Sequence, residues 1–245
     1  MKRFSYKDLF SSLKVTAFVL VLTVGVFLIK ISSVKAADYP ELVSVASDGT
    51  QGNSVSNYPA ISADGRFVAF PSSASNLVSG DTNFSTDVFV HDRQTDTTER
   101  VSVASDGSET NLKSEDLLSI SADGRFVVFG SEASNLVSGD TNFSTDVFVR
   151  DRQTDTTERV SVASDGTQGN LDSKIPSISA DGRFIVFLST ASNLVSGDTN
   201  GTWDVFMHDR QTGTNEQVSI SSSGAQANRN SDRTFISADG RFVSF

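Results

Sequence analysis

Carboxylate and amide side chains recur at one spacing in three stretches of this 245-residue chain. Asp-Thr-Asn-Phe-Ser-Thr-Asp begins at Asp81 and again at Asp140, and Asp-Thr-Asn-Gly-Thr-Trp-Asp begins at Asp198. Oxygen-bearing side chains at alternate positions are typical of loops that bind calcium. We therefore predict a calcium site in each stretch, with the ligands Asp81, Asn83, Asp87, Asp140, Asn142, Asp146, Asp198, Asn200 and Asp204.

These stretches are not EF-hands. The sixth position of an EF-hand loop requires glycine, and here it holds Thr86, Thr145 or Trp203. The twelfth position holds Asp in place of Glu, at Asp92, Asp151 and Asp209. The alternative to a calcium turn is structural, with the Asp and Asn side chains capping the loop through Asx-turns and holding neighbouring backbone. Both interpretations stay open at the level of the sequence.

Other chemistries find little support in the composition. The chain has no Cys, which excludes disulfides, thiolate metal sites and cysteine nucleophiles, and it has only two His. His91 and His208 correspond to Arg150 in the second repeat, so neither is unique as a catalytic base would be. No Gly-x-Ser-x-Gly motif is present, and the net charge of −10 argues against nucleic acid as a partner. We expect no enzyme activity and no cofactor other than calcium.

The elements that carry these side chains are repeated. Ile-Ser-Ala-Asp-Gly-Arg-Phe begins at Ile61, Ile120, Ile178 and Ile236. We place repeat 1 near residues 57–103, repeat 2 near 116–162, repeat 3 near 174–220 and a partial repeat 4 at 232–245. One residue more separates the first two motifs than separates the later ones, and it falls between Ser114 and Ser119. We expect that stretch to be a loop.

Each repeat predicts four short strands. In repeat 2 the first strand ends at Ile120 and Ser121, and the other three span 125–129, 146–149 and 159–164. No helix pattern separates the strands. The two middle strands are apolar on both faces, whereas the last alternates from Val160 to Ala163. Before that last strand, one turn position accepts Asp96, Asp155 or Gly213, which predicts a left-handed backbone.

The fold class that follows is all-β: a β-propeller of four-stranded antiparallel blades, with three full blades and partial blades at both ends. The sequence also resembles the WD-like repeats of TolB-type β-propellers, through Ser-x-Asp-Gly-Arg before the second strand and Asp-Val-Phe-Val in the third. It departs from that family at Ala63, Ala122, Ala180 and Ala238, where the family often has Pro. The resemblance implies a periplasmic scaffold, a substrate-gating domain of a serine peptidase or a binding module.

The long connections share one face of such a meander, because its strands run alternately up and down. We expect these loops at Pro71–Thr86 and Ala104–Ser119 in repeat 1, with equivalents in the later repeats. We predict a protein or glycan ligand on this long-loop face. The alternative is that the loops only fold back and pack, because Leu77, Leu136 and Leu194 need burial.

The N-terminus predicts export. Residues 1–14 are basic, an apolar run of 15 residues follows from Val15 to Ile29, and Ala36 ends a small-residue cleavage site. We predict a cleaved signal peptide at 1–36 and a propeller at 37–245 that is secreted or periplasmic. The alternative is an uncleaved anchor, and only then is the membrane a partner. Residues 37–245 hold 14 Lys and Arg against 29 Asp and Glu, a net charge of −15.

Repeat 4 contains only the first two strands of a blade. The sequence therefore predicts a truncated copy of a longer propeller, or an open edge that drives self-association. Together these features indicate an exported, non-catalytic binding or scaffold module of the cell envelope or extracellular space. The alternative is the accessory propeller of a peptidase or glycosidase whose catalytic domain is absent from this sequence.

Overall fold

The computed structural model describes residues 40–245, and Leu42–Phe245 form one compact unit. The signal peptide predicted at 1–36 lies outside the described residues. Within 40–245, no helix has the length and hydropathy that a membrane span requires.

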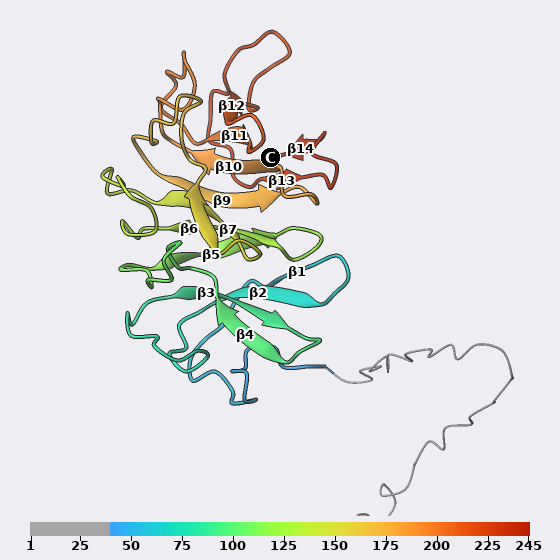
Figure 1. The fold of residues 1–245 in the computed structure, drawn as a ribbon. Helices are drawn as coiled ribbons and strands as arrows, with labels where there is room; N and C mark the ends of the chain where they lie inside the picture. The colour runs from blue at the N-terminus through green and yellow to red at the C-terminus, as the bar shows by residue number, and fades with distance from the viewer. Residues whose placement is uncertain (1–39) are drawn as a thin grey trace, which may run out of the picture. The chain divides into compact units, whose positions relative to one another are not determined.

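Three four-stranded antiparallel sheets and one two-stranded sheet make up the fold (Figure 1). Repeat 1 contains β1 (Ala60–Ile61), β2 (Phe67–Ser72), β3 (Asp87–Asp92) and β4 (Thr97–Arg100). Repeat 2 contains β5 (Ser114–Ile120), β6 (Phe126–Ser131), β7 (Asp146–Asp151) and β8 (Thr156–Arg159). Repeat 3 contains β9 (Ser173–Ile178), β10 (Phe184–Ser189), β11 (Asp204–Asp209) and β12 (Thr214–Gln217), and repeat 4 contains β13 (Phe235–Ile236) and β14 (Val243–Ser244).

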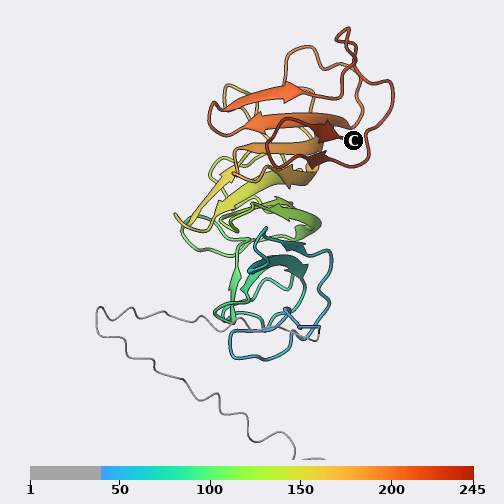
Figure 2. The same ribbon diagram turned by 90° about the vertical axis from the view of Figure 1, so that its right-hand side faces the viewer.

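The strands of each repeat pair in chain order, which confirms the predicted blades. The second and third strands are buried on both faces, since every residue of β3, β6 and β7 is buried. Consecutive sheets follow one another in chain order and do not close into a ring among the described residues (Figures 1 and 2). Their packed faces form the core, in which one hydrophobic cluster includes both Phe129 of repeat 2 and Val88 of repeat 1.

The turn between the first two strands of a blade explains the alanine that replaces proline. In repeat 2, the Ser121 hydroxyl donates to Asp123 (2.6 Å) and accepts from the Phe126 amide (2.9 Å), which closes the turn. This leaves the Ala122 amide free to donate to the Ala180 carbonyl of the next repeat (3.0 Å). Proline has no N–H and could not make this bond. The same bond links Ala63 to Ala122 and Ala180 to Ala238, so the alanines form a ladder across all four repeats.

The last strand of the blade begins and ends earlier than predicted. We expected it at 159–164, but β8 spans Thr156–Arg159 and pairs from Asp151 opposite Thr156. Asp155 adopts φ 57° and closes a shorter turn, which confirms the left-handed position, as do Asp96 at 54° and Gly213 at 70°. Beyond β8 the alternating pattern is wrong, because Ser161 is fully buried. Its hydroxyl donates to Asp146 and accepts from the Val147 amide.

The extra residue of repeat 2 lies in a strand, where we had expected a loop. It falls in β5, whose pairing with β6 shifts register between Ser114 and Leu118. The equivalent strand β9 has a narrower irregularity opposite Val186 and Leu188. A β-bulge can accommodate added residues while the ladder continues on both sides. The bulge at Glu115–Leu117 therefore accommodates the insertion.

The long loops pack against the blades through buried leucines. Leu77, Leu136 and Leu194 are all at most 2% exposed. The connection between β2 and β3 runs over 73–86 and that between β4 and β5 over 101–113, so both are somewhat shorter than predicted. Both lie at the same end of the strands because the sheet is an antiparallel meander. Packing therefore fixes the conformation of the loops that form the long-loop face.

The segment before repeat 1 contacts it as the end of one blade contacts the next. The Thr98 amide donates to the Ser47 hydroxyl (2.9 Å), just as the Thr157 amide donates to the Ser105 hydroxyl (2.9 Å). Val45 forms an isolated bridge with Gln51. This segment stands in the place of the N-terminal partial blade.

Candidate functional site

The predicted calcium ligands of repeat 1 lie together at the long-loop end of β3, around an arginine. The Arg100 Nη1 atom lies 3.3 Å from Asp81 Oδ1 and 3.4 Å from Asp87 Oδ2. It also lies 2.9 Å from a carboxylate oxygen of Glu109. Asn83 donates from Nδ2 to Asp87 (2.9 Å). The protein thus supplies its own cation to this carboxylate pair.

Repeat 2 has the same arrangement. Arg159 Nη1 lies 3.2 Å from Asp140 Oδ1 and 3.1 Å from Asp146 Oδ2, and Asn142 donates to Asp146 (3.0 Å). The Asp146 side chain is fully buried, and burial raises the pKa of both Asp146 and Asp140 above the ordinary range. Arg159 opposes that rise by attracting the ionised forms.

Repeat 3 keeps the acids and loses the arginine. Gln217 stands where Arg100 and Arg159 stand, and within residues 40–245 no Lys or Arg forms an ion pair with Asp198 or Asp204. The Gln217 Nε2 atom is buried without a hydrogen-bond partner. Burial, and then the nearby Asp204, raise the pKa of Asp198. Asn200 donates to the Ala227 carbonyl (3.1 Å), as Asn142 donates to the Gly169 carbonyl (2.8 Å) in repeat 2.

The structure does not bring the twelfth-position acids to these clusters. Asp151 lies at the far end of β7 from Asp146 and accepts two hydrogen bonds from Arg125, at 2.8 and 2.6 Å. Asp92 and Asp209 do the same with Arg66 and Arg183. The calcium prediction for the nine loop residues stays a prediction, and repeat 3 is where the acids lack an internal cation.

A second candidate site, which the sequence analysis missed, lies at the start of the inner strands. A cavity of about 260 Å³ opens there. Its lining comes from all four repeats: Tyr58, Glu115, Asp116, Leu117, Lys174, Ile175 and Arg233. A smaller cavity of about 150 Å³ shares Leu117, Ile175 and Arg233 with it, so the hollow continues along β5, β9 and β13.

The residues that line this cavity occupy equivalent places in the repeats and differ in kind. Tyr58, Leu117, Ile175 and Arg233 each stand three positions before the Ile of the repeated motif. Repeats that agree almost completely in the motif itself diverge here into aromatic, aliphatic and cationic side chains. This internal divergence is the sequence signal that could have located the cavity.

The backbone around the cavity is strained. Tyr58 has φ 38° and Ile175 has φ 54°, a left-handed conformation that β-branched and bulky residues rarely adopt. Residues Glu115–Leu117 lie in the bulge of β5. Strain of this kind concentrates where side chains must be aimed at a ligand.

Charges of both signs surround the opening. Glu115 and Asp116 come from β5, and Lys174 from β9 places its ammonium 4.1 Å from the centre of the Trp203 ring. Arg233 is exposed. An oxygen-rich ligand could meet donors and acceptors here without a large apolar surface.

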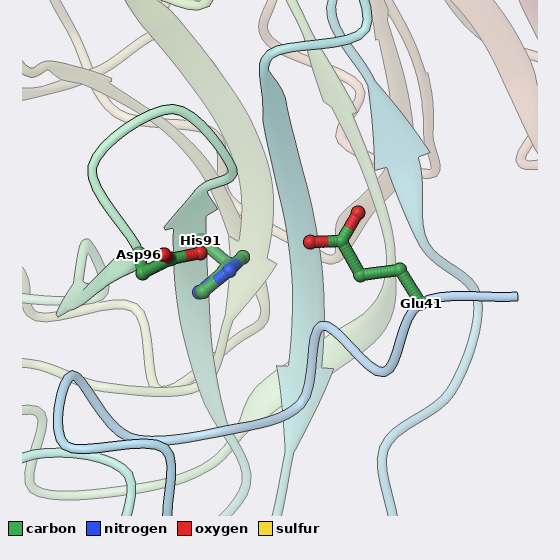
Figure 3. A group of neighbouring side chains, drawn as sticks. All are labelled: Glu41, His91 and Asp96. Atoms are coloured by element: carbon green, nitrogen blue, oxygen red, sulfur yellow. The ribbon is translucent and has the colours of Figure 1, made fainter. Parts of the chain in front are cut away.

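His91 has a structural partner in the described residues. Its Nδ1 lies 2.9 Å from the Thr98 hydroxyl, and the ring lies near Asp96 in the turn after β3 (Figure 3). Repeat 2 fills the same two places with Arg150 and Asp155, which form an ion pair at 2.9 Å. His91 and Asp96 therefore occupy positions at which repeat 2 has a structural ion pair.

Comparison with known proteins supports the fold. No family model and no curated protein matches the chain. The putative TolB from Agrobacterium tumefaciens is similar in structure, with a TM-score of 0.51 and 13% identity over 79% of this chain and 54% of that chain. TolB from Acinetobacter baumannii has a TM-score of 0.48 and 18% identity over 78% of this chain and 37% of that chain. The β-propeller domain of the Trilobed protease from Pyrococcus furiosus has a TM-score of 0.43 and 11% identity over 67% of this chain and 42% of that chain.

The chain thus spans about half or less of the length of these proteins. At such low identity the likeness establishes the architecture alone: stacked blades of a TolB-like β-propeller.

Proposed function

We propose that this chain is a non-catalytic binding module that acts outside the cytoplasm, and that a protein or glycan ligand binds at the long-loop ends of its inner strands. The observation that carries the proposal is the cavity at Tyr58, Glu115–Leu117, Ile175 and Arg233. It combines left-handed non-glycine residues, a β-bulge and side chains that differ between otherwise similar repeats.

Repetition supports this assignment. Side chains that hold the blades together must recur in every repeat, because every blade makes the same contacts. Side chains that recognise a ligand gain nothing from recurring around a shared opening. The cavity is where the repeats stop resembling one another, so recognition rather than stability accounts for its residues.

We propose no catalytic role because the buried acids and the histidines make structural contacts. Asp87 accepts hydrogen bonds from Ser102 (2.6 Å) and Thr110 (2.9 Å), and Asp146 accepts one from Ser161. Such contacts recur from blade to blade, as a structural role requires. Export rests on the basic and apolar segments of residues 1–36.

A binding screen with the purified chain tests the proposal. A glycan array and a peptide array would identify the ligand, and Tyr58→Ala with Arg233→Ala should abolish its binding, because both side chains are exposed and contact the opening. The matched control is Gln94→Ala with Gln211→Ala, two exposed residues in the short turns at the other end of the blades. Equal loss in both double variants would refute the assignment of the site.

A further inference from the structure

Two phenylalanines stand almost completely in solvent at equivalent loop positions. Phe84 and Phe143 are each 97% exposed. They occupy the same place in the loops before β3 and β7, between the Asn and Ser of the predicted calcium motif.

Their backbone makes this exposure more informative than a stray surface side chain would be. Phe84 has φ 56° and Phe143 has φ 58°, in the left-handed region that bulky residues avoid. Repeat 3 has Gly201 at this position, with φ 64°. Glycine adopts this conformation without strain, so the loop favours glycine and repeats 1 and 2 keep phenylalanine against that preference. Strained positions that gain no packing indicate function.

Hydrogen bonds hold the loop backbone on both sides of each ring. Asn83 Oδ1 accepts the Ser85 amide (2.9 Å), which closes a turn around Phe84, and its Nδ2 donates to the Thr110 carbonyl (3.0 Å). In repeat 2, Asn142 accepts the Ser144 amide (3.1 Å) and donates to the Gly169 carbonyl (2.8 Å). A ring on a pre-ordered loop loses little conformational entropy when it binds a ligand.

Two similar grooves lie along the blades, and the loop that lines one of them carries Phe143. One groove of about 620 Å³ and a second of about 630 Å³ lie between consecutive repeats. The first is walled by Ser105, Asp106 and Asn135–Ser138, and the loop that supplies Asn135–Ser138 continues directly to Phe143. Hydroxyl, amide and carboxylate side chains therefore share this groove with Leu136 and Val137.

We propose that Phe84 and Phe143 form a two-ring platform that stacks against successive sugar rings of a neutral linear polysaccharide. A pyranose has a flat face of C–H groups and a rim of hydroxyls, which matches a single exposed ring surrounded by polar side chains. Equivalent rings on consecutive repeats match a ligand that repeats itself, and engaging both at once raises affinity through effective concentration.

The surroundings disfavour other occupants. A protein interface centres on a contiguous apolar patch, whereas each ring stands among Asp, Thr, Asn and Ser. A membrane surface attracts basic segments, whereas residues 37–245 carry a net charge of −15. The same charge makes an acidic polysaccharide a poor ligand.

The platform is separate from the inner-strand cavity, so this proposal and the proposed function can fail independently. Titration calorimetry of the purified chain with cellohexaose, xylohexaose, mannohexaose and chitohexaose tests it. We expect at least one hexasaccharide to bind and Phe84→Gly or Phe143→Gly to weaken that binding about tenfold each. The double variant should abolish it. Gln94→Ala with Gln211→Ala, in the short turns at the other end of the blades, should leave it unchanged.

Glycine at both positions copies repeat 3, so the variants should fold and melt no lower than the parent chain. The reciprocal variant Gly201→Phe adds a third ring and should strengthen binding of longer oligosaccharides several-fold. The proposal is overturned if none of the four sugars binds, or if binding survives in the double variant. It is also overturned if the rings instead mediate attachment to vesicles of phosphatidylcholine and phosphatidylglycerol.

Discussion

The ring of Phe67 lies against the α-carbon of Gly124, in the space that any side chain at Gly124 would need. A β-carbon at Gly124 would stand 2.1 Å from Cδ2 of that ring. The guanidinium of Arg152 covers the same ring at 4.4 Å and forms an ion pair with Glu99 of repeat 1 (2.6 Å). In the same way, a β-carbon at Gly182 would stand 2.2 Å from the Phe126 ring, and one at Gly240 would stand 2.3 Å from the Phe184 ring. The phenylalanine–glycine contact therefore recurs at all three boundaries between repeats, and we call it the inter-repeat lock. An arginine of the next repeat covers the ring at the first two boundaries.

Gly124→Ala should destabilise the chain strongly, because the added methyl group must displace Phe67 from the boundary. We expect a loss of about 3 kcal/mol in the free energy of unfolding, from overpacking together with left-handed strain. Gly65→Ala is the matched control. It has nearly the same backbone, φ 72° against 74°, but its nearest neighbour would be 3.7 Å away. Urea denaturation of both variants measures the difference, and equal losses would show that the lock contributes nothing.

Arg159→Gln should reproduce in repeat 2 the arrangement that repeat 3 has naturally. Removing the cation from a buried carboxylate pair costs about 3 kcal/mol. It should also raise the pKa values of Asp140 and Asp146 further, because Arg159 lowers both. When carboxyl pKa values are higher in the folded than in the unfolded state, the free energy of unfolding is lower at neutral pH. This loss becomes smaller as the pH falls and the acids protonate. The deficit of the variant, measured by urea denaturation, should therefore be larger at pH 7 than at pH 5.

Calcium should stabilise the chain through repeat 3 if the loop prediction is right. Asp198 and Asp204 are buried acids without an arginine, and a bound cation would satisfy them. A hundredfold excess over the dissociation constant adds about 2.7 kcal/mol. The melting temperature should rise between chelator and millimolar calcium, and Asp198→Asn with Asp204→Asn should remove the rise. Arg159→Gln should add a second calcium-dependent increment. An unchanged melting temperature in all three chains would reject the prediction.

The Arg125–Asp151 pair should contribute stability that disappears in acid. Arg125 holds the pKa of Asp151 well below its ordinary range through two hydrogen bonds. The contribution is fully present above the unfolded-state pKa of about 3.9 and is lost as the pH falls below it toward the folded value. Asp151→Asn should therefore be less stable than the parent above pH 4, with a gap that narrows at lower pH. Arg125→Gln should show the same narrowing. A gap independent of pH would mean that the pair acts only through packing.

The exposed aromatic residues in and next to β13 and β14 predict self-association. Phe242 is 66% exposed, although Phe67, Phe126 and Phe184 at the same position each cover a glycine of the next repeat. Phe235 and Phe245 add exposed rings of 59% and 58%. Light scattering should show dimers or larger species, and Phe242→Ser should reduce them. A monomer at high concentration would contradict this prediction.

The blades were predictable because their signals are local. Asp-Gly between apolar runs, and strands apolar on both faces such as Asp146–Val149, specify a central strand pair wherever they occur. The position of the last strand was not, because the shift depends on Ser161 replacing a ladder bond with its hydroxyl at Asp146. That contact joins the first residue of β7 to a residue beyond the end of β8, and it leaves no periodic pattern in the sequence.

The candidate site divides in the same way. The spacing of Asp140, Asn142 and Asp146 revealed a cluster, but the arginine that enters it, Arg159, comes from another strand. The only sequence signal that connects the arginine with the acids is its replacement by Gln217 in repeat 3. The inner-strand cavity arises from four chain segments about one repeat apart, so no single stretch of sequence contains it.

The uniformity of the lock has a consequence for how a newly made chain folds. In the native state Phe67 packs against Gly124. Gly182, in the equivalent turn of repeat 3, would present the same surface to that ring. A repeat that docks on the wrong neighbour would leave the repeat between them looped out, and that contact must break before the native order can form. We therefore expect refolding to include a slow phase from such off-register species. The wider bulge of β5, which distinguishes repeat 2 from repeat 3, is one of the few features that could bias the search toward the correct neighbour.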